Sequence, residues 1–174
     1  MQDLQPVSIE LHHEIEQFLY NEALMLDKEM VRDWLSDVVH PDIRYQMVVT
    51  EERFRKDKST SAARAVLPYD DGMQELELRV RQFETGLQTM MDPPQRLSRA
   101  VNNVQVFHGD SEREFVALSQ GMLSRFRRQY EHEQVIYRRE DILKRGDDNA
   151  LRLLRRRIEL GERVIRNKNL LLFL

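Results

Sequence analysis

The stretch RAVNNVQVFHGDSEREFVALSQGMLSRF (Arg99 to Phe126) decides the fold class of this chain. It contains two strand-like segments, Arg99 to His108 and Glu114 to Phe126, separated by the turn residues Gly109-Asp110. Two short extended segments around a turn signal are typical of neighbouring antiparallel strands. We therefore predict a hairpin here, and with it a mainly antiparallel sheet.

The second of these segments has two chemically different faces, because successive side chains of a strand point in opposite directions. We expect the face with Arg125 to be the outer face of the sheet. One face carries Val116, Leu118, Met122 and Phe126, and the other carries Ser119, Gly121 and Arg125.

Downstream, two further strand-like segments are predicted, Tyr130 to Leu143 and Leu151 to Leu160, with turn residues from Gly146 to Asn149 between them. The tail Leu170 to Leu174 is entirely apolar and predicts a last short strand. Five consecutive apolar side chains would form an aggregation-prone patch if they were exposed to solvent. We expect the tail to be buried against the sheet or a neighbouring subunit.

Upstream, the apolar residues follow a helical spacing. Ser8 can cap a first helix whose stripe includes Ile15, Leu19 and Leu26. A second, short helix is predicted over Glu29 to Ser36. His40-Pro41 ends it, because the residue before a proline is disfavoured in the helical region.

The middle of the chain predicts a strand, a loop and a third helix. Ile43 to Val49 alternates with period two, and Glu51 to Ala65 has no period and is interpreted as a long surface loop. Asp71 caps the third helix, with Gln74 in the capping-box position. Helices followed by a run of strands predict an α+β fold. We expect a single domain, residues 1–174, with three helices packed on one strongly curved, mainly antiparallel sheet.

Composition excludes several classes of function. The chain has 174 residues, 41% hydrophobic and 33% charged, and no cysteine. Disulfides, zinc-thiolate sites, iron–sulfur clusters and cysteine nucleophiles are therefore excluded. The N-terminus has neither the basic nor the apolar region of a signal peptide, and the longest apolar run is too short to span a membrane. We expect a cytoplasmic protein without a membrane partner.

Charge is distributed unevenly along the chain. The net charge is −3, but residues 125–174 contain 14 basic and 8 acidic residues, whereas residues 1–124 contain 13 and 22. This asymmetry predicts charge complementarity within the molecule or with a partner subunit. An acidic chain whose basic run contains no aromatic residues gives no indication of nucleic-acid binding.

Histidines are the only candidates for chemistry on this chain. His12, His13 and Glu16 suggest a non-haem iron triad, but neighbouring helical residues point about 100° apart. We expect a solvated polar surface there. His132 is a candidate pocket base without a visible relay, and a half-exposed strand residue is the preferred interpretation. We predict no catalytic, cofactor-binding or metal-ligating residue.

Arginines in the strand region predict a subunit interface. Arg155 and Arg157 share one face, whereas Arg156 shares the other with Leu154 and Ile158. An arginine on such an apolar face is expected to form a buried or intersubunit pair with a carboxylate. Arginine suits interfaces because its planar fork binds carboxylates and its stem covers apolar surface. The predicted interface set is Arg125, Arg127, Arg139, Arg155 and Arg157 on the outer face, with Leu170, Leu172, Phe173 and Leu174 from the tail.

Four stretches resemble the β (small) subunits of Rieske-type aromatic-ring-hydroxylating dioxygenases, and the similarity runs nearly end to end in consistent order. The RRED strand and the closing KNLLLFL most resemble the naphthalene and biphenyl branch. The stretches are FLYNEALMLDKEMVRDWLS (18–36), LELRVRQFETG (76–86), DPPQRLSRAVNNVQV (92–106) and YRREDILKRGDDNALRLLRRRIELGERVIRNKNLLLFL (137–174).

This resemblance implies a cystatin-like, SnoaL-like α+β cone, in the superfamily of nuclear transport factor 2 and scytalone dehydratase. It implies an assembly of three α and three β subunits, in which the α subunit carries the Rieske iron–sulfur cluster and the mononuclear iron. Such an oxygenase adds dioxygen to an arene, giving a cis-dihydrodiol with electrons from NADH. The β subunit is structural, with no cofactor and no catalytic residue of its own.

Two other functions stay open. One is a stand-alone dehydratase or isomerase of the same cone fold, which requires a cavity lined by facing titratable groups, with His132 as its candidate. The other is a binding module without an enzyme partner. Co-purification with a larger iron protein distinguishes both from an oxygenase subunit.

Overall fold

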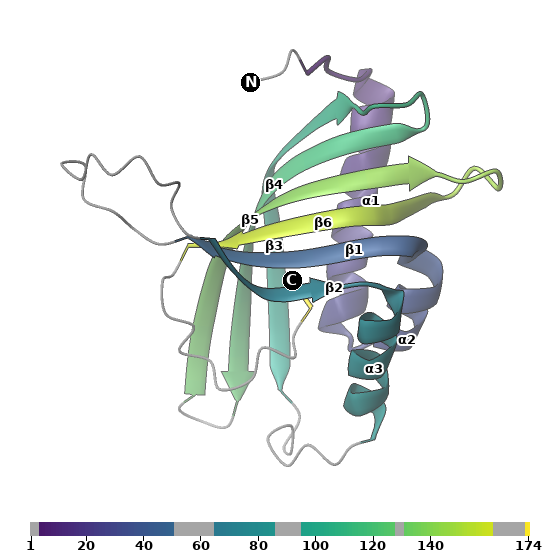
Figure 1. Cartoon of the computed structure of the whole chain (residues 1–174). Coiled ribbons are helices and arrows are strands. Elements are labelled where there is room, and N and C mark those ends of the chain that lie inside the picture. The colour runs from purple at the N-terminus through teal and green to yellow at the C-terminus, as the bar shows by residue number, and fades with distance from the viewer. Residues whose placement is uncertain (1–3, 51–64, 86–94, 128–130, 162–172) are drawn as a thin grey trace.

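The computed structural model describes residues 4–50, 65–85, 95–127, 131–161 and 173–174. Two longer helices and a short helical segment lie against one six-stranded sheet (Figure 1). The helical elements are α1 (Ile9–Asp27), α2 (Val31–Asp33), which continues into the π-helical turn η1 (Trp34–Val38), and α3 (Met73–Glu84). The strands are β1 (Val39–Thr50), β2 (Ala65–Asp71), β3 (Arg96–His108), β4 (Glu114–Arg127), β5 (Glu131–Arg145) and β6 (Leu151–Leu160).

The sheet has the order β2-β1-β6-β5-β4-β3. Every neighbouring pair is antiparallel except β1 and β6, which run parallel and join the N-terminal part of the sheet to the C-terminal part. The strands curve around α1, which lies behind the sheet in Figure 1. The predicted α+β class, with its strongly curved, mainly antiparallel sheet, is confirmed.

Helix α1 covers the face of the sheet that we call the inner face. Its N-terminus is capped by Ser8, whose hydroxyl accepts a hydrogen bond from the Leu11 amide at 3.3 Å. Ile15, Leu19 and Leu26 are buried along the predicted stripe. Because these positions repeat every three to four residues, one side of α1 packs on the sheet and the other faces solvent.

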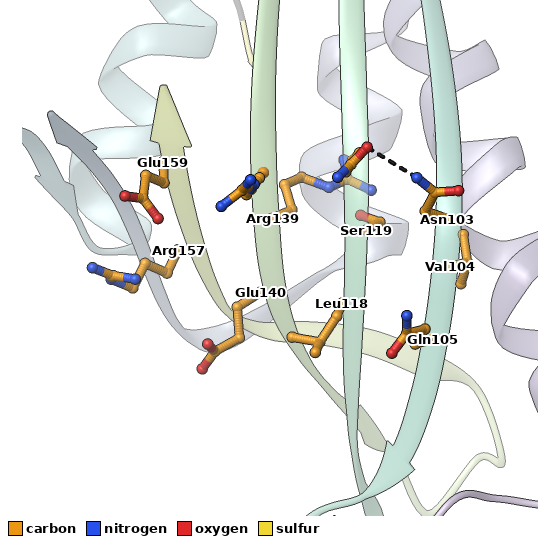
Figure 2. A pocket seen from close by; sticks show the side chains of 11 residues that line it. Asn103, Val104, Gln105, Leu118, Ser119, Arg139, Glu140, Arg157 and Glu159 are labelled. Carbon is orange, nitrogen blue, oxygen red and sulfur yellow. Dashed lines mark hydrogen bonds between the residues drawn. The ribbon is translucent and has the colours of Figure 1, made fainter. Parts of the chain in front are cut away.

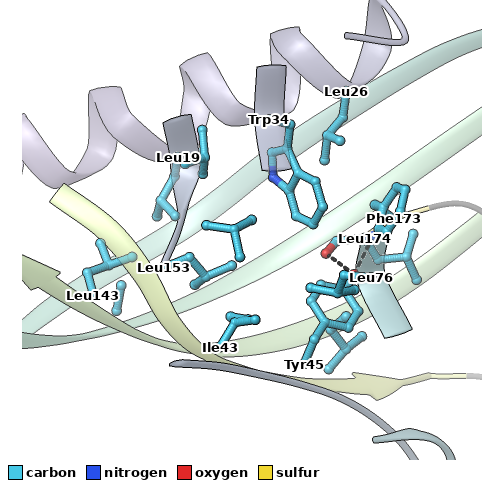
Figure 3. Close-up of a cluster of buried hydrophobic side chains, with 14 of the residues drawn as sticks. Leu19, Leu26, Trp34, Ile43, Tyr45, Leu76, Leu143, Leu153, Phe173 and Leu174 are labelled. Atoms are coloured by element: carbon cyan, nitrogen blue, oxygen red, sulfur yellow. Dashed lines mark hydrogen bonds between the residues drawn. The ribbon is translucent and has the colours of Figure 1, made fainter. Parts of the chain in front are cut away.

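The hydrophobic core lies between the inner face and the helices, as Figure 3 shows. Trp34 and Tyr45 are both fully buried at its centre, with Leu76 of α3 beside them. The core also includes Leu153 of β6 and Phe173. Residues from both halves of the chain therefore contribute to one core.

Several elements differ from the prediction, including β3, which begins at Arg96, and β5, which ends at Arg145. Strand β1 begins at Val39 and continues through His40-Pro41, and β2 was not predicted. Helix α3 is capped at Gly72, one residue after Asp71, and the Gly72 amide donates to the Glu75 carboxylate at 2.9 Å. Phe173 and Leu174 are not in a strand, and 170–172 lie outside the described residues, as does most of the predicted loop.

Candidate functional site

Four charged side chains meet inside the domain, and their buried ionic cluster links α1 to the sheet. Arg156 of β6 donates two hydrogen bonds to Glu22 of α1, each 2.7 Å long, and two to Asp141 of β5, at 2.8 and 2.9 Å. Arg139 lies 3.5 Å from Glu22 and 3.3 Å from Asp141. The cluster holds two cations and two carboxylates, so its formal charges balance.

These charges are neutralised within the chain. Burial by itself would raise the pKa of Glu22, but the positive charges of Arg156 and Arg139 outweigh it. Hydrogen bonds from Arg156 and from the Trp34 indole, 2.9 Å away, add to their effect, and the pKa falls to about 2. A general base works best with a pKa near the working pH. Glu22 is therefore a structural anion.

Phe173 and Leu174 fill the space beside this cluster. The Phe173 ring lies 4.6 Å from the Trp34 ring, between centroids, and 6.5 Å from the Tyr45 ring (Figure 3). Both residues are only 2% exposed. The predicted burial of the tail is confirmed for these two residues, and they pack inside their own chain.

The opposite, outer face of the sheet is not covered by a helix in the described part of the chain (Figure 1). Two neighbouring hollows of about 490 and 630 Å³ lie on it and share Leu118 and Glu140 as lining residues. Figure 2 shows the first hollow, with Gln105 and Arg157 at its sides. A broad surface with charged and apolar side chains side by side is typical of a protein–protein interface.

Apolar side chains on the outer face form two cross-strand pairs between β4 and β5, separated by the polar pair Gln120–Arg138 and by Glu140. Met122 pairs with Ile136, and Val116 pairs with Ile142. Ile136 is 61% exposed, which is high for a large aliphatic side chain.

The face assignment of β4 was wrong. Ser119 and Gly121 point into the domain, and the Val116–Leu118–Met122 face points outward. Tyr137 explains the reversal, because its ring crosses over Gly121, where a Cβ atom would approach the ring to 2.2 Å. A small residue is needed there for the large side chain from β5 to fit.

The predicted arginine set divides between the two faces. Arg155 and Arg157 are exposed on the outer face, as expected. The outer-face placement is wrong for Arg139, which is 4% exposed in the buried ionic cluster. It is also wrong for Arg125, which lies on the inner-face side and forms a 2.7 Å ion pair with Glu133.

Three other interface candidates are Arg127, Leu170 and Leu172. The side chain of Arg127 and residues Leu170 and Leu172 lie outside the described residues. Arg138 was not singled out from the sequence, yet it is exposed on the outer face, opposite Glu159 of β6. The alternating pattern of β5 would have identified Arg138 as an outer-face residue if it had been known which alternate positions of that strand face outward.

The candidate histidines do not form a site. His12 Nε2 lies 3.2 Å from the Val104 carbonyl oxygen, whereas His13 lies 3.9 Å from Glu16 on the same helix. His132 is exposed and stacks on Phe126, with 4.3 Å between the ring centroids. Among the residues described, no group of three or more histidines and acidic side chains is arranged to hold a metal ion. No helix in the described segments is long and apolar enough to cross a membrane.

The curved sheet and the filled interior define a cone-shaped α+β domain, and no helix covers its outer face in the described part of the chain. Residues 21–167 match the model of the ring hydroxylating beta subunit family. The chain therefore belongs to the β subunits of ring-hydroxylating dioxygenases.

Solved structures agree with this assignment. A chain of naphthalene 1,2-dioxygenase, from a structure with indole bound in the active site, is 27% identical. The match covers 97% of this chain and 88% of that one, with a TM-score of 0.90. The β subunit of benzoate 1,2-dioxygenase from Burkholderia mallei is 18% identical over 98% and 100% of the two chains, with a TM-score of 0.70.

A more distant fold neighbour is ActVI-ORFA from Streptomyces coelicolor. It is 13% identical, over 89% of this chain and 98% of that one, with a TM-score of 0.64. At this identity the likeness shows the fold alone.

Proposed function

We propose that this chain is the structural, non-catalytic β subunit of a naphthalene- or biphenyl-type oxygenase. The assembled enzyme adds dioxygen to an arene, giving a cis-dihydrodiol with electrons from NADH, in the cytoplasm. The observation that supports the non-catalytic role is the way in which the interior of the domain is filled. Its carboxylates are paired with arginines, and Phe173 and Leu174 occupy the space that a substrate would need.

The iron groups of such an enzyme do not fit this chain. The sequence has no cysteine for a Rieske cluster, and the described residues offer no histidine–carboxylate group for a mononuclear iron. We therefore assign both groups to the α subunit and propose a structural role for this chain. The stand-alone dehydratase or isomerase has less support, because its candidate base His132 is exposed and stacks on Phe126.

We further propose that the outer face of the sheet is the subunit interface in an assembly of three α and three β subunits. Arg155 and Arg157 lie on that face, together with the apolar pairs Met122–Ile136 and Val116–Ile142. Exposed apolar area surrounded by arginine and glutamate suits a partner surface of mixed character. Arg127, Leu170 and Leu172 remain candidates for the same interface.

The test is purification of this chain with and without the α subunit, followed by metal analysis and sedimentation. We expect no stoichiometric iron on the isolated chain, iron only in the complex, and an association state of at least three chains. About one iron atom per isolated chain would contradict the non-catalytic role. A monomer in both preparations would contradict the assembly.

A further inference from the structure

Side chains from five separate parts of the fold contact the pair Phe173-Leu174, in the way that a protein contacts a bound ligand. The Phe173 ring lies in an aromatic slot. Trp34 and Tyr45 form two of its walls, and the Arg79 guanidinium lies 4.5 Å from the centre of the ring. A cation over the face of an aromatic ring attracts it electrostatically.

The backbone of the pair is bound by fixed polar groups. Arg99 Nη2 donates to the Phe173 carbonyl oxygen at 2.7 Å, and Arg156 Nη1 donates to the Leu174 carbonyl oxygen at 3.0 Å. The Tyr45 hydroxyl accepts from the Leu174 amide at 2.7 Å and lies 2.8 Å from the Leu174 carbonyl oxygen, to which it donates. Both carbonyl groups and one amide of the pair are therefore recognised.

These groups are already ordered by contacts that do not involve the pair. Arg156 is fixed by Glu22 and Asp141, and Arg99 by Asp27 at 2.6 Å. Trp34 donates to Glu22. A pocket whose walls are set in advance, with an apolar slot and a few convergent polar groups, has the features of a preorganised binding site.

We propose that this part of the interior is a peptide-recognition site specific for an aromatic residue followed by leucine. Phe173-Leu174 is its resident ligand, held in the same chain. The ring supplies affinity through the aromatic slot, and the two carbonyl groups fix the register through Arg99 and Arg156. A free Phe-Leu dipeptide carries every group that the site contacts. It therefore binds when the resident pair is removed.

The experiment uses a chain ending at Leu172 and the probe N-acetyl-Phe-Leu, with N-acetyl-Ala-Leu as the matched control. Trp34 is the only tryptophan in the sequence, so its fluorescence reports the slot directly. We expect N-acetyl-Phe-Leu to raise the melting temperature and change the Trp34 emission in a saturable manner. The alanine peptide should bind at least about tenfold more weakly, because most of the apolar contact area is lost. Equal responses to the two peptides, or no response to either, would overturn the proposal.

A second variant covers the case in which the shortened chain does not fold. Full-length Phe173→Ala keeps the backbone contacts and empties only the aromatic slot, and toluene is the probe. Its melting temperature should rise with toluene, whereas that of the wild type, whose slot is full, should not. If neither variant folds, with or without its probe, the pair is an inseparable part of the core and the proposal fails.

Discussion

Arg156 Nη2 lies 2.7 Å from Glu22 Oε2, and neither side chain has any exposed surface. This contact joins β6 to α1 across most of the sequence. A buried ion pair stabilises the fold only when both partners are present. If one partner is removed, the other charge stays desolvated without a counter-ion.

Glu22→Gln should therefore lower the free energy of unfolding by about 3–5 kcal/mol, since the two arginines would keep one carboxylate between them. The matched control is Glu14→Gln, on the same helix. Glu14 pairs with Arg145 at 2.7 Å but is about half exposed, so its loss should cost less than about 1 kcal/mol. Urea unfolding of both variants checks the difference. Equal losses would mean that burial does not govern the strength of these pairs.

The same carboxylate makes stability depend on pH. The pKa of Glu22 is depressed in the folded protein, to about 2 from its ordinary value of 4.5. A depressed pKa contributes stability above the unfolded value, and that stability disappears as the pH falls through 4.5 toward 2. We expect the free energy of unfolding to fall over this range, by an amount on the order of 3 kcal/mol. Glu22→Gln should show a visibly smaller fall, measured by urea unfolding at several pH values.

Gly121→Ala should destabilise the protein, because the new Cβ would lie 2.2 Å from the Tyr137 ring. Overpacking of this kind costs roughly 1–3 kcal/mol. Combining it with Tyr137→Leu should remove most of that cost, since the ring is what the methyl group meets. A double-mutant cycle from thermal or urea unfolding measures the coupling. Strictly additive effects would contradict the proposed fit between Gly121 and Tyr137.

Changes on the outer face should affect association before they affect folding. We expect Ile136→Glu, Arg155→Ala and Arg157→Ala to shift the sedimentation profile toward smaller species, with and without the α subunit, and to leave the circular dichroism spectrum unchanged. Leu78→Ser is the control, because Leu78 is 64% exposed on α3 and away from the sheet face. Variants that assemble like the wild type would remove the outer face as the interface.

The strands from Arg96 onward could be predicted from the sequence, because turn residues mark their ends. Leu151 to Leu160 was predicted with both boundaries correct. The buried face of β4 could not be predicted from its hydrophobic pattern. Small inward-facing residues such as Gly121 make room for Tyr137 of β5, and the sequence of β4 alone does not show that a large side chain lies there.

Irregular pairing also concealed part of the site. Leu154 was expected on the inner face with Arg156, but a register shift between Ile142 and Leu143 places Leu153 there instead. A bulge changes the alternation by one residue without a sequence signal of its own. The pairing of Arg156 with a carboxylate was predicted, but its partner Glu22 was not identified, for a related reason. Glu22 looks like any helical glutamate until the strand opposite it is known.

The parallel pairing of β1 with β6 has a consequence for biosynthesis. Val39 of β1 pairs with Leu153 of β6. The sheet therefore cannot be completed while the ribosome is still synthesising the strands that lie between β1 and β6 in the sequence. Until β6 emerges, the nascent chain carries β1 with one unpaired edge and a helix whose inward glutamate lacks its counter-ions. Unpaired edges and exposed apolar surface attract chaperones and favour aggregation. We expect this protein to reach its native state only after β6 has been synthesised and has left the ribosome, and to be most prone to aggregation before that step.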